Sequence, residues 1–192
     1  MANVPRQTAP TLRDARLTLR APRPQDNHDR QLIGRHAEFV YLNGGSTQAL
    51  TPFTTTEITQ WYDRLSAERF GWILDVGERG VGTARLYNVD TANRSAHYAI
   101  GIFDPALWGQ GLGTVATRLV ARFAFEQLGL HRISLVVLDV NARARAAYKR
   151  CGFAEEGLLR DTVLLDDGWH SDIAMSILEA DYRALAPTWE TA

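Results

Sequence analysis

The chain is poor in cysteine. Its 192 residues include one, Cys151, so neither an intramolecular disulfide nor a cysteine-rich metal site can form. The five histidines have neither the i,i+4 nor the His-x-His spacing that is typical of metal ligands. We therefore expect no disulfide and no bound metal. A reducing compartment, the cytoplasm, fits this composition.

Long apolar runs and an excess of one charge are also absent. No apolar stretch approaches the ~20 residues that span a bilayer, and the first twenty residues lack the basic and apolar regions of a signal peptide. Lys and Arg number 21 against 22 Asp and Glu, so the formal charge is −1. We expect an unexported protein whose partner is neither nucleic acid nor an anionic membrane.

Hydrophobic residues make up 45% of the chain, enough for the core of a single domain over residues 1–192. The periodicity of the sequence predicts a meander of strands, a strand-helix-strand unit over residues 96–138, and a final hairpin around Asp167-Gly168. This order predicts an α/β fold with a mixed sheet. The expected strands are 16–20, 72–76, 81–90, 95–103, 133–138, 153–165 and 169–178, and the expected helices are 26–39, 57–66, 111–128 and 141–151.

Residues 133–138 form a nearly unbroken apolar run of β-forming residues. Such a run is typical of a strand that is covered on both faces, as parallel strands are. We therefore expect this strand to be buried on both faces. The segment 43–56, rich in Gly, Ser and Thr, is expected to be a loop, of the kind that often shapes a substrate pocket.

A glycine-rich loop lies between a predicted strand and the longest predicted helix. There, main-chain N–H groups and the helix dipole can hold a pyrophosphate, and glycine lets the backbone approach the anion. A tight turn with no ligand is the simpler interpretation of the same residues. The loop consists of Trp108, Gly109, Gln110, Gly111, Leu112, Gly113 and Thr114.

The same loop also fits a dinucleotide fingerprint. Gly111-x-Gly113-x-x-Ala116 has the required spacing, and Asp139 follows the next strand, where a ribose-binding acid is expected. That interpretation predicts a nicotinamide enzyme. Against it, residues 104–108 intervene between the strand and the loop, and the C-terminal part predicts a hairpin in place of further parallel strands.

Two polar residues of the next helix are placed to act together. Asn141 is expected to cap the helix, and Tyr148 lies seven residues later, which returns to nearly the same face. One amide and one phenol can therefore face one cleft. The alternative is an ordinary helix cap with a half-buried tyrosine.

Together these residues resemble the GNAT superfamily of N-acetyltransferases, and in particular its RimJ/RimL-like branch. The resemblance covers about residues 98–178. Three blocks carry it: Ile100-Gly101-Ile102 with the glycine loop, Asn141 through Tyr148 to Gly152-Phe153, and Asp167-Gly168-Trp169 with Asp172–Leu178. It implies a mixed, mostly antiparallel sheet flanked by helices, with a βαβ unit that binds acetyl-CoA.

The resemblance also implies a role for each block. Acetyl-CoA would bind in a V-shaped gap between two strands, and Tyr148, with an ordinary pKa of about 10, would protonate the departing thiolate. Backbone amides near Ile102 would polarise the thioester carbonyl. The residues implied in cofactor binding are Ile100, Gly101, Ile102, Trp108, Gly109, Gln110, Gly111, Leu112, Gly113, Thr114 and Asn141.

The chain departs from the family where a general base is expected. Many relatives have an acidic residue at the position of Ala99, and often a serine at that of Ala144. Glu38 and Asp104 are alternative carboxylates that could act through water. Cys151, near a helix C-terminus, is expected to be a packed thiol and not a nucleophile.

These features predict an enzyme that transfers an acetyl group from acetyl-CoA to a primary amine, by direct attack in a ternary complex. The acceptor is a peptide N-terminal amine or a small-molecule amine. A nicotinamide-dependent oxidoreductase and a non-catalytic acyl-CoA-binding module remain alternatives, and a homodimer remains open. The basic face of the helix over 141–151 is expected to be solvated, although one of its side chains could reach a coenzyme A phosphate. That face consists of Arg143, Arg145, Lys149 and Arg150.

Overall fold

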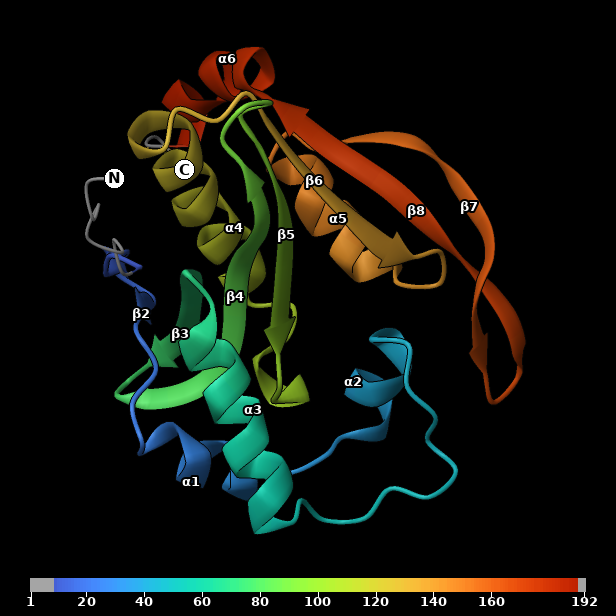
Figure 1. Cartoon of the computed structure of the whole chain (residues 1–192). Helices are drawn as coiled ribbons and strands as arrows, with labels where there is room; N and C mark the ends of the chain where they lie inside the picture. Colours follow the sequence, from blue (N-terminus) through green and yellow to red (C-terminus); the bar gives the residue numbers. More distant parts are fainter. Residues whose placement is uncertain (1–8, 190–192) are drawn as a thin grey trace.

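The computed structural model describes residues 9–189, which form one mixed sheet of eight strands with helices on both faces (Figure 1). The strand order is β1-β2-β3-β4-β5-β6-β8-β7. The strands are β1 (Leu12–Arg13), β2 (Thr18–Arg20), β3 (Phe70–Val76), β4 (Arg79–Asp90), β5 (Ser95–Ile102), β6 (Arg132–Leu138), β7 (Ala154–Leu165) and β8 (Gly168–Leu178). The helices are α1 (Asp26–Ile33), α2 (Ala37–Leu42), α3 (Thr55–Ala67), α4 (Leu112–Arg122), α5 (Ala142–Arg150) and α6 (Glu179–Trp189).

The two halves of the sheet separate at its centre. Strands β1 to β5 pair antiparallel, as do β6, β8 and β7, while β5 and β6 are the parallel pair that joins the halves. Their pairing covers only Ser95–His97 against Arg132–Ser134. Beyond His97 the two strands diverge, and one edge of β5 is left without a strand partner.

Alternation along β5 assigns the helices to opposite faces of the sheet. The hydroxyl of Tyr98 lies 3.1 Å from that of Thr117 in α4, so even-numbered residues of β5 face α4. The ring of Phe103, beyond the end of β5, contacts Phe39 of α2 and Trp61 of α3 with centroids 5.6 and 5.9 Å apart. Odd-numbered residues therefore face α2 and α3.

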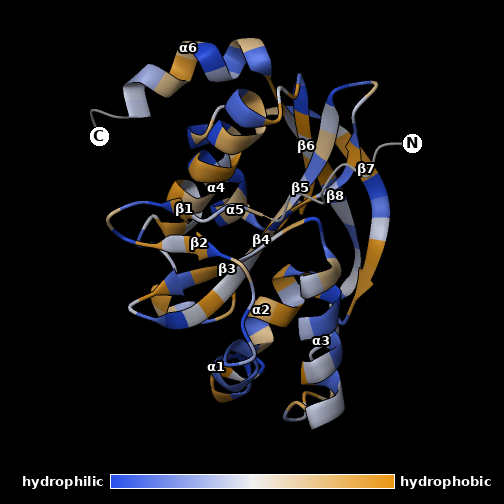
Figure 2. Ribbon diagram, turned by 60° about the vertical axis from the view of Figure 1, so that its left-hand side comes forward, coloured by the Kyte–Doolittle hydropathy of each residue, from blue (hydrophilic) through white to orange (hydrophobic). Residues whose placement is uncertain are grey.

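The core lies between the sheet and α4. Trp72 and Phe70 of β3 are fully buried and contact the ring of Phe123, which follows α4. The Trp72 indole donates a 2.7 Å hydrogen bond to the carbonyl of Pro10, which ties the N-terminal segment to the sheet. Figure 2 shows hydrophobic residues along the inner side of α4 and the strands that it covers.

Helix α1 is anchored by a buried ion pair. The Arg20 guanidinium donates to both carboxylate oxygens of Asp26, at 3.0 and 2.7 Å, and to Asp75 of β3 at 2.5 Å. The side chains of Arg20 and Asp26 are 7% and 1% exposed. Arg20 and Asp75 are 55 residues apart in the chain. The ion pairs of Arg20 therefore fix the start of α1 against the sheet.

The predicted meander, βαβ unit and final hairpin are confirmed, but several element boundaries are wrong. The helix expected over 26–39 is broken at Gly34, whose φ of 72° ends α1. The helix expected over 111–128 ends as α-helix at Arg122 and continues as a π-helical turn, η2 (Phe123–Gln127). Strand β1 and helix α6 were not predicted, because two residues and a weakly periodic tail give little sequence signal.

The expectation that residues 133–138 are buried on both faces is also wrong. Strand β6 is parallel to β5 and antiparallel to β8, and Val136 is 54% exposed. The divergence of β5 and β6 uncovers one face of β6 there. Within residues 9–189, no helix has the length and apolar character to cross a membrane.

Candidate functional site

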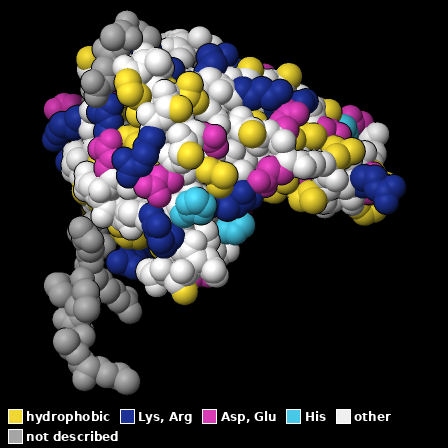
Figure 3. All heavy atoms as spheres, turned by 90° about the horizontal axis from the view of Figure 1, so that it is seen from above, with side chains coloured by type: hydrophobic (Ala, Val, Ile, Leu, Met, Phe, Trp, Pro, Cys, Tyr) yellow, Lys and Arg dark blue, Asp and Glu magenta, His cyan; other side chains and the backbone are white. Residues whose placement is uncertain are grey.

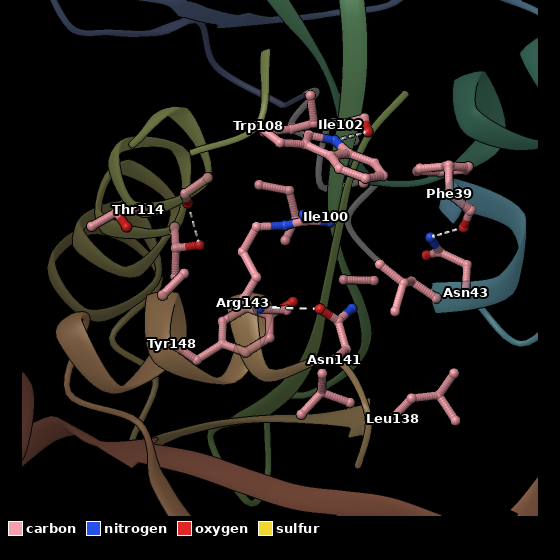
Figure 4. A pocket seen from close by; sticks show the side chains of 18 of the residues that line it. Phe39, Asn43, Ile100, Ile102, Trp108, Thr114, Leu138, Asn141, Arg143 and Tyr148 are labelled. Carbon is pink, nitrogen blue, oxygen red and sulfur yellow. Dashed lines mark hydrogen bonds between the residues drawn. The ribbon is translucent and has the colours of Figure 1, made fainter. Parts of the chain in front are cut away.

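A cavity of about 780 Å³ opens where β5 and β6 diverge. It is bordered by the strands, by the N-terminal ends of α4 and α5, and by α2 (Figure 4). The structure therefore brings together blocks that lie about forty residues apart in the chain. The cavity is lined by eleven of the twelve predicted site residues: Ile100, Gly101, Ile102, Trp108, Gly109, Gly111, Leu112, Gly113, Thr114, Asn141 and Tyr148.

Gln110 is the predicted site residue that does not line the cavity. Its side-chain amide donates a 2.9 Å hydrogen bond to the carbonyl of Ala106. This bond ties the loop to the segment before it, where η1 (Pro105–Leu107) forms a single 3₁₀ turn. Gln110 therefore supports the shape of the loop.

The free edge of β5 presents main-chain groups to the cavity. The N–H of Phe103 donates to Val81 of β4 at 2.9 Å. Because successive N–H groups of a strand point to opposite edges, those of Ile102 and Ile100 point toward the gap. The Ile102 carbonyl accepts a 2.9 Å hydrogen bond from the Trp108 indole. Trp108 thus braces the loop against the strand and leaves the two N–H groups for a ligand.

The glycine loop leads directly into the N-terminus of α4. Gly111 is the N-cap residue, in the left-handed conformation with φ 79° and ψ 0°, where a side chain with Cβ is strained. The first N–H groups of a helix have no partner within it. The amides of Leu112, Gly113 and Thr114 are therefore available to an anion, and the helix dipole favours negative charge at this position.

Three arginines add positive charge around the loop. A Cβ placed on Gly111 would lie 3.4 Å from Nη1 of Arg16, and Arg143 and Arg150 also line the cavity. The Arg143 guanidinium lies 3.9 Å from the centre of the Trp108 ring. The two other basic residues of α5, Arg145 and Lys149, instead pair with Glu155 on the surface. Sequence reasoning overlooked Arg16, which reaches the loop only through the tertiary fold.

Asn141 and Tyr148 face the cavity from α5, as their spacing predicts (Figure 4). The Asn141 side chain accepts a 3.1 Å hydrogen bond from the N–H of Ala144, so it caps the helix as expected. The Tyr148 ring packs against Phe153 and Tyr98. Its hydroxyl forms no hydrogen bond with any residue that the structure describes. Burial, with the nearby Cys151 thiol as a smaller cause, raises the pKa of Tyr148 above its ordinary value.

Cys151 is a packed thiol, as the sequence predicts. It is fully buried, and its Sγ lies 3.5 Å from the carbonyl of Thr114. Burial raises the pKa of Cys151 to about 12. A thiol of such low acidity carries almost no thiolate at neutral pH and is a poor nucleophile.

One side of the cavity is formed by the α2 segment. It is lined by Phe39, Leu42 and Asn43 of the α2 segment and by Ala99. A Cβ on Gly101 would lie 3.2 Å from the Phe39 ring, so this glycine allows α2 to approach the strand.

Neither carboxylate considered from the sequence as a base lines this space. Glu38 is exposed and lies 3.4 Å from Arg143. Asp104 accepts a 3.0 Å hydrogen bond from the N–H of Ala106 and lies 3.9 Å from Arg79. The acidic residue that does line the cavity is Asp172 of β8.

A polar cluster connects α2 to the β7–β8 hairpin. The Tyr41 hydroxyl donates a 2.9 Å hydrogen bond to Asp167. His170 lies 3.0 Å from the same carboxylate and 3.5 Å from Asp139. The hydrogen bond from Tyr41 is the main cause of a lowered Asp167 pKa. The residues of this cluster do not line the cavity; they tie α2 to the hairpin, which projects from the body of the protein (Figure 1 and Figure 3).

The sheet topology differs from that expected of a nicotinamide-binding fold. The chain leaves β5 at Ile102, and η1 intervenes before the loop. Asp139 accepts from the N–H of Ser171 and lies 3.5 Å from His170 of the hairpin, and it does not line the cavity where a ribose-binding acid is expected. The strands after β6 run antiparallel, whereas a dinucleotide-binding fold continues with parallel ones.

Comparisons with known proteins agree with this geometry. Spermidine N(1)-acetyltransferase of Escherichia coli K12 is 28% identical over 132 residues, or 67% of this chain and 69% of that protein. The ribosomal protein uS5-alanine N-acetyltransferase of the same strain is 28% identical over 127 residues, or 65% of this chain and 64% of that protein.

A solved structure shows the same fold. The crystal structure of spermidine N-acetyltransferase from Vibrio cholerae, in complex with CoA and spermine, matches with a TM-score of 0.73 at 23% identity, over 88% of this chain and 99% of that one. The family model described as "Acetyltransferase (GNAT) domain" matches residues 16–154. The chain therefore belongs to the GNAT family of acetyltransferases, enzymes that transfer an acetyl group from acetyl-CoA to an amine.

Proposed function

We propose that this cavity holds acetyl-CoA with its pyrophosphate on the loop amides of residues 110–114 and its thioester beside the free edge of β5. The observation that carries the proposal is the continuity of the cavity from the N-terminus of α4 to the gap between β5 and β6. Phosphates need the helix N-terminus and the nearby arginines. A pantetheine arm needs unpaired main-chain groups, which the divergent strands supply.

The chemistry is then shared between main chain and side chain. The N–H groups of Ile100 and Ile102 are placed to donate to the thioester carbonyl as it gains negative charge. The Tyr148 hydroxyl, protonated because burial raises its pKa, supplies a proton to the departing sulfur. Its lack of another hydrogen-bond partner among the described residues leaves it available for this role.

Acetyl-CoA is expected to raise the melting temperature of the wild type. At about 100 times Kd the stabilisation is about 2.7 kcal/mol, or roughly 5–10 °C for a domain of this size. Gly111→Val should abolish this shift, because it strains the left-handed residue and fills the approach to the amides. Differential scanning fluorimetry with acetyl-CoA, coenzyme A and NADPH measures the shift.

Gly129→Val is the matched control. Gly129 also has a positive φ, of 62°, and a Cβ there meets nothing within 4 Å, but the residue does not line the cavity. This variant should lose stability and keep the full shift with acetyl-CoA. Stabilisation by NADPH and not by acetyl-CoA would contradict the proposed site.

We propose a primary amine of modest basicity as the acceptor, namely a peptide α-amine or a small-molecule amine. An α-amine with a pKa near about 7.7–8.0 is partly neutral at physiological pH, whereas a lysine near about 10.4 is almost fully charged. Strand β5 carries Ala99 where many family members have an acid, so little help with deprotonation comes from β5. The name of the ribosomal-protein relative from Escherichia coli supports a peptide α-amine and the RimJ/RimL-like assignment, whereas the spermidine acetyltransferase of the same strain is named for an amine about as basic as lysine.

A screen for thiol release identifies the acceptor class. We expect turnover with alanine-starting peptides or with small-molecule amines of modest basicity such as aminoglycosides. We expect less with polyamines and with lysine peptides whose N-termini are blocked, because those amines are mostly protonated. The assay follows free coenzyme A with a thiol reagent at pH 7.5. Turnover confined to the blocked lysine peptides would contradict this acceptor class, and no turnover with bound acetyl-CoA would favour a non-catalytic module.

A further inference from the structure

Asp172 occupies a distinctive position in the cavity. Among the cavity-lining residues in the described part of the chain, it is the one acidic side chain. It lies on β8 directly opposite Leu138 of β6 and Leu159 of β7. Residues opposite each other in neighbouring strands project from the same face of the sheet, and Leu138 lies in the cavity (Figure 4).

The carboxylate of Asp172 is also unengaged. Between residues 9 and 189 no hydrogen bond or ion pair reaches it. Three other acidic residues of this part of the fold each have at least one partner, although Oδ1 of Asp139 accepts no hydrogen bond. Glu38 pairs with Arg143, Asp139 accepts from the N–H of Ser171, and Asp167 accepts from Tyr41. A half-buried carboxylate between two leucines is poorly solvated, so a cation that enters the cavity stabilises it by pairing with it.

The cationic side chains of the cavity lie on other elements than Asp172. Arg16 lies beside the glycine loop, where the phosphates of the donor are expected, and Arg143 of α5 lies over the Trp108 ring and pairs with Glu38. Asp172 lies on β8, and the nearest titratable group along its strand, His170, is engaged with Asp167. Building on the proposed function, we propose that Asp172 is the catalytic carboxylate that binds the incoming amine and takes up its proton.

The transfer then balances without any further reactant. The ammonium of the acceptor binds at Asp172 and loses one proton to that carboxylate, directly or through one water. The amine nitrogen forms its bond to the thioester carbonyl carbon, and the carbon–sulfur bond breaks. The sulfur leaves with the proton from Tyr148, and the second proton of the nitrogen returns through solvent to the tyrosine. Asp172 releases the proton that it took up to solvent, so the products are an amide, coenzyme A and one proton.

An aspartate in this role also favours the proposed acceptor class. The ordinary pKa of an α-amine, about 7.7–8.0, lies below that of the lysine ε-amine, about 10.4. Loss of the proton to a carboxylate is therefore less unfavourable from an α-amine. The carboxylate that β5 lacks at Ala99 is thus supplied from the other half of the sheet.

The test compares two amines that differ in charge. Thiol release is measured for wild type, Asp172→Asn and Asp172→Glu. The charged amine is an alanine-starting peptide or spermidine, whichever wild type turns over faster. The uncharged amine is hydroxylamine, which is neutral at pH 7.5. We expect Asp172→Asn to lower kcat/KM for the charged amine by about 10²–10⁴-fold. The loss with hydroxylamine should be less than tenfold, and Asp172→Glu should recover part of the activity.

Two controls separate this role from damage to the fold. Asp161→Asn changes an exposed carboxylate of β7 that lies outside the cavity, at a positive φ that asparagine tolerates, and should leave both activities unchanged. The melting shift with acetyl-CoA should persist in Asp172→Asn. Equal losses with both amines, or wild-type kcat/KM in Asp172→Asn, would overturn the inference alone. A wild type that binds acetyl-CoA but turns over no amine would overturn the proposed function, and the inference with it.

Discussion

Replacing Tyr148 with phenylalanine is expected to lower kcat by about 10²–10⁴-fold, or roughly 3–5 kcal/mol of barrier. The hydroxyl acts only as the sulfur becomes negative, so binding of acetyl-CoA should change little. The ring remains, and its contacts with Phe153 and Tyr98 should keep α5 in place. Steady-state kinetics and the melting shift with acetyl-CoA measure the two effects separately.

The pH profile provides a second measure of the same role. Because burial raises the pKa of Tyr148, the proton-donating form persists above the ordinary tyrosine pKa of about 10. Measured at saturating amine, kcat should show no fall up to about pH 10. A fall in kcat well below that pH, or wild-type kcat in Tyr148→Phe, would show that Tyr148 is not the acid.

Replacing Arg20 with alanine is expected to reduce the free energy of unfolding by about 3–5 kcal/mol, because it leaves the buried Asp26 and the partly buried Asp75 carboxylates without their counterion. Arg20→Lys should lose less, since lysine keeps the charge but cannot donate to both oxygens of Asp26 in the same planar geometry. Urea unfolding monitored by circular dichroism measures both changes.

An exposed ion pair with the same nitrogen–oxygen distance serves as the control. Arg183 lies 2.7 Å from Glu179, as Arg20 does from Asp26, but its side chain is 70% exposed. Exposed pairs contribute little because water and salt screen them, so Arg183→Ala should unfold at nearly the wild-type urea concentration. Similar losses in both variants would show that the burial of Arg20 does not govern its contribution.

Much of the fold could be predicted from local patterns in the sequence. Alternating and helical periodicities located the central strands, and Asp167-Gly168 marked the hairpin, because these signals arise from neighbouring residues. The break at Gly34 and the π-helical turn after Arg122 were missed. The helical periodicity continues past both points and therefore marks neither; α1 ends at Gly34 through its positive φ of 72°.

The candidate site shows the same division. The sequence by itself determined the glycine loop and the shared face of Asn141 and Tyr148, because spacing within one loop or one helix controls both. Only the tertiary structure decided that β5 and β6 diverge, since that depends on pairing between segments far apart in the chain. The same divergence brings Asp172 from β8 into a cavity with Tyr148 from α5. Their meeting follows from the register of β8 against β6, which no local sequence pattern encodes.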